Sequence, residues 1–256
     1  MIDTNVTGTP RTRTKRVLRM LGRIAVALLI VYTAARIVWR ASGSNEYELA
    51  IDRNGVKVFT LKVPGEDLRV VRAETRVRSS MAGLVALLTE VCGEYAFKPP
   101  APTGLIGRIR ANLFPNFGCI DGGEVHRVDG HLQYGKFRFV FPFPFRPREF
   151  VTRSDIHQDP RTGKVWIEYA AAPEQAPPDD CCVRVMRMNN FFQLTPVGKG
   201  FVEIEYVLNL DEGGFLPVWL ANYTYPKFVF NILRGFPPRL AQTKYQSAKS
   251  DVIVEQ

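Results

Sequence analysis

Residues 201–234 read FVEIEYVLNLDEGGFLPVWLANYTYPKFVFNILR, and within this stretch the apolar residues change from one periodicity to another. In its first part apolar side chains alternate with acidic ones, which predicts a strand with one apolar face. Two glycines and Pro217 follow, and proline is tolerated in the first turn of a helix. Apolar residues then recur at helical spacing up to the break at residues 235–238, with Pro226 expected to bend the helix. A strand therefore leads directly into a long C-terminal helix.

The chain before this stretch predicts an antiparallel sheet. Short alternating runs are separated by turn sequences such as Asp129-Gly130 and residues 159–163 (DPRTG). A single early helix is expected from Ser79 or Ser80 to about Tyr95. The fold class is therefore α+β, a long curved antiparallel sheet with one helix early and another at the end. The expected strands are residues 47–52, 56–63, 68–77, 124–128, 132–141, 150–158, 164–171, 183–194 and 201–210.

The N-terminal segment, residues 1–44, is basic and contains a candidate membrane helix. Residues 1–45 hold eight basic residues and one acidic residue, so most of the formal net charge of +9 lies there and the body offers no nucleic-acid surface. Residues 17–39 are long enough to span a bilayer as a signal-anchor helix. Six basic residues precede the apolar centre and two follow it. The positive-inside rule therefore predicts a cytoplasmic N-terminus, with residues 45–256 outside, in a bacterium the periplasm.

Two other interpretations of this segment stay open. It is also compatible with a cleaved signal peptide that leaves a secreted domain, although Arg36 and Arg40 stand where small neutral residues normally precede the cleavage site. The third interpretation is an amphipathic helix that lies on the membrane or on the protein.

The four cysteines leave the disulfide pattern open. Cys92 and Cys119 can pair, whereas the adjacent Cys181 and Cys182 are too strained locally for a disulfide to be the default expectation. No C-x-x-C pair occurs, so a structural zinc site is not expected.

Three segments resemble the START domain, the lipid-transfer family with the helix-grip fold. Residues 139–151 (FVFPFPFRPREFV) resemble its PwPvsxRDfv signature, and residues 182–196 (CVRVMRMNNFFQLTP) resemble its VRxxxxxgxwxLtP strand pair. The most specific segment, residues 209–222 (NLDEGGFLPVWLAN), resembles the DpgGxlPxwlxN start of the C-terminal helix. The resemblance covers roughly residues 45–240. It implies a sheet wrapped around the C-terminal helix, with an internal cavity for a lipid or other hydrophobic small molecule.

The sequence departs from the family pattern at three places. The Arg-Asp pair of the family is Arg148-Glu149 here, which keeps both charges, and Arg148 is expected to be structural and paired with a nearby acid. Residues 98–118 form an insertion, with a short basic amphipathic turn, where many relatives have a short loop. Some cholesterol-binding relatives place an arginine in the cavity at the position of Ser154, so the resemblance does not imply that ion pair here.

The apolar strand faces supply the candidate cavity lining. Alternate residues of a strand share one face, and the resemblance directs these faces toward a cavity rather than a solid core. Flexible methionines and flat phenylalanines suit an acyl or sterol-like ligand. The candidate ligand-binding residues are Phe137, Phe139, Phe141, Phe150, Thr152, Ser154, Met186, Met188, Asn190, Phe192 and Tyr206.

The sequence contains no recognisable catalytic constellation. His126, His131 and His157 are scattered, and no nucleophile elbow, phosphate loop or dinucleotide fingerprint occurs. We therefore expect a binding protein that is not an enzyme and uses no cofactor and no metal. Two alternatives stay open, a ligand-free interaction domain of the cell envelope and a cyclase or aromatase-like enzyme of the same superfamily. The sequence identifies no protein partner.

Overall fold

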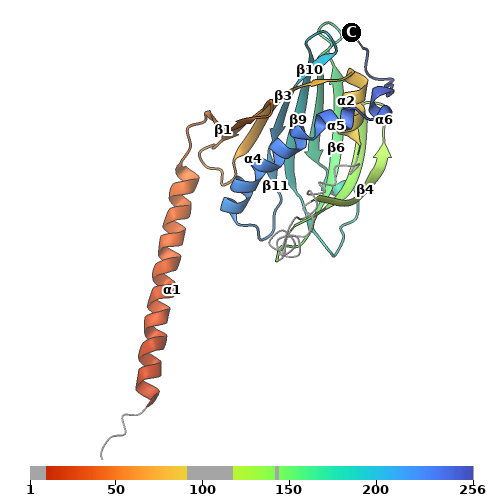
Figure 1. Ribbon diagram of the computed structural model, residues 1–256. Coiled ribbons are helices and arrows are strands. Elements are labelled where there is room, and N and C mark those ends of the chain that lie inside the picture. The colour runs from red at the N-terminus through yellow and green to blue at the C-terminus, as the bar shows by residue number, and fades with distance from the viewer. Residues whose placement is uncertain (1–9, 91–117, 142–143, 256) are drawn as a thin grey trace, which may run out of the picture.

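A long N-terminal helix projects from the body of the molecule (Figure 1). The computed structural model describes residues 10–90, 118–141 and 144–255. Helix α1, Pro10–Ala41, leaves the body at the end opposite to the C-terminus. Within the described residues, Lys15–Ala41 is the one helix long and apolar enough to cross a membrane. Its most apolar part is not buried against the body.

The body is a single curved sheet of 11 strands. Its main path runs β1-β2-β3-β10-β9-β7-β6-β5-β4, and every neighbouring pair along it is antiparallel, as the sequence predicts. Outside this path β11 pairs with β9, and β8 lies parallel to β6. The strands are β1 (Tyr47–Arg53), β2 (Val56–Leu61), β3 (Val70–Arg78), β4 (Gly118–Arg127), β5 (Leu132–Val140), β6 (Arg148–Gln158), β7 (Val165–Ala171), β8 (Val183–Arg184), β9 (Arg187–Pro196), β10 (Phe201–Leu208) and β11 (Leu210–Asp211).

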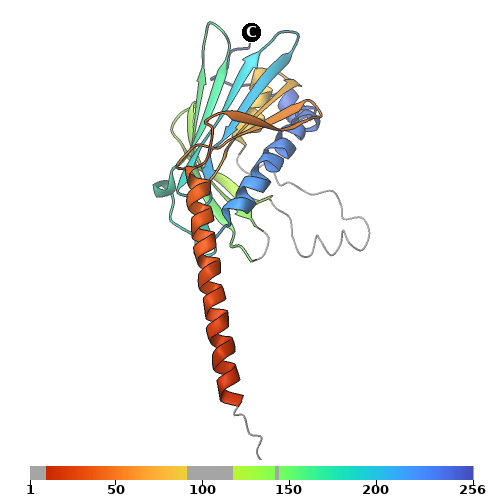
Figure 2. The same cartoon turned by 90° about the vertical axis from the view of Figure 1, so that its left-hand side faces the viewer.

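The sheet curls around the C-terminal helix α4, Val218–Arg234, which crosses its concave face (Figure 2). Because α4 is amphipathic, it buries one stripe of side chains, including Val229, Phe230 and Leu233, against the sheet. Helix α2, Met81–Thr89, completes the core at the other end of the molecule. This arrangement is the predicted helix-grip fold.

The C-terminal end of the described body meets the start of α2. Ser80 accepts a hydrogen bond from the amide of Gly83 at 3.0 Å, as an N-cap residue does. The carboxylate of Glu255 accepts from the amides of Met81 and Ala82 at 3.1 and 2.7 Å. These bonds satisfy N–H groups that have no partner inside the helix.

Several predicted boundaries are wrong. Helix α2 ends at Thr89, because Glu90 is already extended, instead of continuing to about Tyr95. The strand expected over residues 183–194 is divided into β8 and β9, and that over residues 201–210 into β10 and β11. After α4 the chain forms two further short helices, α5 (Phe236–Leu240) and α6 (Thr243–Gln246), and a 3₁₀ turn, η1 (Pro173–Gln175), follows β7.

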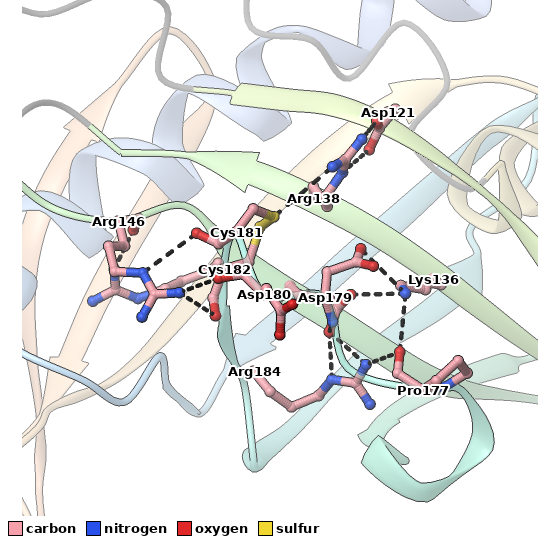
Figure 3. The surroundings of a disulfide bond; sticks show 12 residues. Asp121, Lys136, Arg138, Arg146, Pro177, Asp179, Asp180, Cys181, Cys182 and Arg184 are labelled. Atoms are coloured by element: carbon pink, nitrogen blue, oxygen red, sulfur yellow. Dashed lines mark hydrogen bonds and ion pairs between the residues drawn. A yellow bond between two sulfur atoms is a disulfide. The ribbon is translucent and has the colours of Figure 1, made fainter.

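The adjacent cysteines Cys181 and Cys182 form a disulfide, so the expectation that they would not is wrong (Figure 3). The loop that carries them is held by arginines from neighbouring elements. The guanidinium of Arg146 donates to the carbonyl oxygens of Asp180 at 2.5 Å and of Cys181 at 3.3 Å, and that of Arg138 lies 3.8 Å from the Cys181 sulfur. These contacts fix the loop, which local sequence reasoning does not reveal.

Cys119 is also part of a disulfide. Cys92, its partner in the sequence prediction, lies outside the described residues, as do residues 98–117 of the expected insertion.

Candidate ligand cavity

A cavity of about 180 Å³ lies between the concave face of the sheet, the end of α2 and helix α4. Pockets that hold small ligands are typically about 300–1,000 Å³, so a lipid-sized ligand requires the lining side chains to move. The lining residues are Leu88, Thr89, Glu90, Cys119, Phe137, Phe139, Thr152, Ser154, Tyr169, Met188, Asn190, Phe192, Tyr206 and Ile232.

Strand register brings these residues together from distant parts of the chain. Phe192 on β9 is paired with Ile167 on β7 and with Tyr206 on β10. The rings of Phe192 and Tyr206 stack with centroids 4.1 Å apart. From the opposite side, Phe228 of α4 meets Phe139 edge to face at 5.7 Å. Aromatic rings from β5, β7, β9 and β10 therefore form part of the walls.

Eight of the eleven predicted lining residues surround this one cavity: Phe137, Phe139, Thr152, Ser154, Met188, Asn190, Phe192 and Tyr206. The other three do not line it. Phe150 is buried behind the wall, stacked on Phe137 at 4.8 Å, and Phe141 lies 4.7 Å from the guanidinium of Arg148. Met186 is 63% exposed, because the strand is interrupted between β8 and β9 and the alternation of faces stops there.

Sequence reasoning missed six lining residues, which are Leu88, Thr89, Glu90, Cys119, Tyr169 and Ile232. A signal existed for Tyr169, which alternates with Val165 and Ile167 along the predicted strand at residues 164–171. No comparable signal exists for Leu88, Thr89 and Glu90, because only the packing of α2 on the sheet brings its end to the cavity.

A row of polar side chains crosses the inner face of the sheet. Gln133, Ser154, Tyr169 and Asn190 are successive partners on β5, β6, β7 and β9. Gln133 donates to the carbonyl oxygen of Thr89 at 3.1 Å, and the Tyr169 hydroxyl donates to that of Leu88 at 2.8 Å. Two members of the row therefore hold the end of α2 against the sheet.

Other polar groups at the cavity have no hydrogen-bond partner within the described part of the chain. These are the hydroxyls of Thr152, Ser154 and Tyr206 and the amide nitrogen of Asn190, whose oxygen accepts from the Asn209 amide at 2.8 Å. All four residues are at most 7% exposed. Burial raises the pKa of Tyr206, so its phenol stays neutral at physiological pH. The unpaired groups are thus neutral donors and acceptors.

The charged pair Arg148-Glu149 joins neighbouring segments of the fold and does not line the cavity. Arg148, 1% exposed, donates to the carbonyl oxygens of Glu212 at 3.2 Å and Gly213 at 3.0 Å, instead of pairing with an acid as predicted. Gly213 and Gly214 have φ values of 64° and 63°, a conformation that favours glycine and presents the Gly213 carbonyl to this arginine. The loop before α4 is therefore tied to β6.

Glu149 is the centre of a buried ion cluster. Its carboxylate pairs with Lys136 at 2.8 Å and with Arg184, and its side chain is 1% exposed. Burial raises the pKa of Glu149, but the hydrogen bonds from Lys136 and Arg184 outweigh this effect and lower it to about 2. The carboxylate therefore stays ionised and joins β5 and β6 to β8.

Comparison with known proteins identifies the family. The model of the START domain matches residues 119–246, half of the chain, and the chain belongs to this family. Domains of this family generally bind lipids or other hydrophobic ligands. They are mostly not enzymes, although some relatives are cyclases. Within the described residues no three His, Cys, Asp or Glu side chains form a group that can hold a metal ion.

Several known proteins are similar to this chain. The crystal structure of a STAR-related lipid transfer protein fragment from Xanthomonas axonopodis is 24% identical, covers 77% of this chain and 99% of its own, and has a TM-score of 0.61. Human STARD10 is 17% identical over 76% of this chain and 72% of its own, with a TM-score of 0.58. An uncharacterized protein of Pseudomonas aeruginosa is 24% identical over 192 residues, 75% of this chain and 85% of the relative. At these identities the structural likeness is one of fold.

Proposed function

We propose that residues 45–256 bind a lipid or other hydrophobic small molecule in the cavity under α4, without converting it, and that residues 1–44 hold this domain at a membrane. One observation carries the proposal. Buried polar groups in proteins are nearly always hydrogen-bonded. Around this cavity, among the described residues, the hydroxyls of Thr152, Ser154 and Tyr206 and the Asn190 amide nitrogen make no hydrogen bond and open onto the cavity. A bound ligand with a polar end can pair with them.

Membrane attachment is supported by the way α1 joins the body. Arg36 pairs with Asp67 at 2.6 Å, and the indole nitrogen of Trp39 donates to the Asp67 carbonyl oxygen at 2.9 Å. Arg40 donates to the carbonyl oxygen of Gly65 at 2.8 Å. The last turns of α1 are therefore fastened to the loop between β2 and β3. Cleavage of α1 as a signal peptide would remove these contacts, so they favour a retained anchor.

Exposed aromatic residues at the start of α4 support contact with the membrane. Phe215 is 83% exposed, Trp219 70% and Tyr223 62%. The first turns of α4 lie on the side of the body that α1 leaves (Figures 1 and 2). Aromatic side chains are favoured at the interface between membrane and water. We place the N-terminus in the cytoplasm and the body outside it, which the disulfide of Cys181 and Cys182 supports, because disulfides persist in oxidising compartments.

The proposal is tested by measuring whether lipid is bound to the full chain. We expect native mass spectrometry of the chain released from detergent micelles to show adducts of lipid mass. The matched variant is Phe139→Trp, which fills the cavity from a wall position and should lose the adduct while melting close to the parent temperature. A folded parent chain that carries no lipid adduct in any detergent would instead favour the ligand-free interaction domain.

A further inference from the structure

A second, larger pocket lies beside the membrane helix. Its volume is about 790 Å³, and it is bounded by the end of α1, the loop between β2 and β3, strand β11 and the first turns of α4. Charged side chains of both signs line it, among them Arg36, Arg40, Asp67 and Asp211. Apolar side chains, including Leu216 and Val218 of the α4 region, line another part. The charged part of the lining can contact the headgroup of a membrane lipid, and the apolar part can contact its acyl chains.

Among the described residues, the pocket and the cavity share Met188 as a common wall residue. Ala171 is paired with Thr152, and Met188 is paired with Leu210. Because Ala170 is paired with Asn189 and Tyr169 with Asn190, Ala171 and Met188 lie side by side on the inner face of the sheet. Ala171 and Leu210 line the larger pocket, Thr152 lines the cavity, and Met188 lines both.

Met188 is suited to open and close this wall. Methionine is unbranched and has three rotatable bonds, so its side chain adapts to different spaces. A rotation of the side chain leaves the backbone pairing of β9 with β7 and β11 intact. Its neighbour Ala171 is small and leaves room for the movement. On the outer side the exposed Met186 continues an apolar surface into the larger pocket.

We propose that the larger pocket is the entrance through which a lipid of the adjacent membrane leaflet reaches the cavity, and that Met188 is the residue that closes it. The pocket lies where α1 meets the body, at the level expected for lipid headgroups. Arg36 and Arg40 of α1 and the ion pair of Arg187 with Asp211 surround it, so both charges of a zwitterionic headgroup find partners. The inference rests on the proposed lipid binding and on the retention of α1.

Loading kinetics test this entrance. The full chain is inserted into vesicles of phosphatidylethanolamine and phosphatidylglycerol that contain phosphatidylethanolamine with a fluorophore on its acyl chain. Fluorescence protected from a water-soluble quencher reports lipid inside the body. We expect Met188→Ala to speed both loading and release about fivefold or more, because it removes the barrier while most of the cavity wall remains.

A second variant separates an effect on the path from an effect on the cavity. Leu210→Trp fills the larger pocket beside Met188, and Leu210 does not line the cavity. We expect it to slow loading about fivefold or more and to leave the final protected fraction unchanged. The control is Ile232→Ala, which enlarges the cavity from α4, away from the wall, and should change the final fraction more than the rates.

The outcomes distinguish the entrance from the binding itself. If the parent chain loads lipid and both Met188→Ala and Leu210→Trp load at the parental rate, the entrance is refuted and lipid binding stands. If the parent chain protects no lipid at all, both the entrance and the proposed function are refuted.

Discussion

The buried carboxyl group of Glu212 should make the stability of this protein fall as the pH rises. Glu212 lies in the loop before α4, is 4% exposed and accepts a hydrogen bond from the hydroxyl of Tyr225 on α4. Burial raises the pKa of Glu212 from 4.5 to about 7, and the hydrogen bond from Tyr225 and the charge of Arg148 only partly oppose this. Between pH 4.5 and 7 the folded state therefore holds a proton on Glu212 that the unfolded state has already released.

The sign and size of the effect follow from this difference. Below pH 4.5 both states are protonated and Glu212 has no effect on the free energy of unfolding. Between pH 4.5 and 7 the unfolded state releases its proton first, so stability decreases by up to about 1.4 kcal/mol per pH unit. Above pH 7 the loss is complete, at about 3 kcal/mol. Glu212→Gln keeps an oxygen for the Tyr225 hydroxyl and removes the titration.

Thermal unfolding of the full chain in one detergent, at pH 5 and at pH 8, measures this effect. For a domain of this size 1 kcal/mol corresponds to about 2–4 °C in Tm. We expect Glu212→Gln to melt about 5–10 °C above the parent at pH 8 and much closer to it at pH 5. Glu48→Gln, at an exposed position of β1, is the matched control and should follow the parent at both pH values. If Glu212→Gln shows the same pH dependence as the parent, Glu212 does not hold a proton in the folded state.

Four further results are expected. Glu149→Gln should lower the free energy of unfolding by about 3 kcal/mol, because Lys136 and Arg184 lose their common partner. The stability of the parent should also fall as the pH drops from 4.5 toward 2, because Glu149 then becomes protonated. Urea unfolding at pH 3 and at pH 7 checks both expectations. Replacing Cys181 and Cys182 together by serine should shift Tm by no more than about 2 °C, because a disulfide between neighbours closes almost no loop; a larger shift in calorimetry would contradict this. Phe139→Ala should cost less than the about 3–5 kcal/mol of a core phenylalanine, since Phe139 borders a cavity, and a full core penalty in urea would argue for a closed core. A phosphatase reporter fused to the C-terminus should be active, and the protein should stay in membranes after an alkaline wash, whereas a shortened soluble form would establish cleavage.

Local sequence patterns were sufficient to predict most strands of the sheet. Alternation of apolar and polar residues is a property of neighbouring residues, so it located the strands and the faces that carry Phe137, Phe139, Thr152 and Ser154. The turn from a strand through two glycines into α4 is local as well. These residues therefore lie where their periodicity predicts.

Contacts between segments far apart in the sequence could not be predicted from local sequence patterns. Leu88, Thr89 and Glu90 belong to the cavity because Gln133 and Tyr169 hold the carbonyl oxygens at the end of α2. The disulfide of Cys181 and Cys182 lies in a loop fixed by Arg138 and Arg146 from other elements. Such partners are separated by tens of residues, and a pattern read along the chain does not contain them.

Met186 and Met188 show what the sequence alone predicts and what only the tertiary structure determines. The chain alone places both on one face, because they are two residues apart in a run with strand character. In the folded protein β8 pairs with β6 and ends at Arg184, whereas β9 begins at Arg187 and pairs with β7. Met186 falls in the gap and is exposed, and Met188 enters the wall of the cavity. The alternation of side chains survives only along a continuous hydrogen-bonded ladder, and the length of that ladder is set by partner strands far away in the sequence.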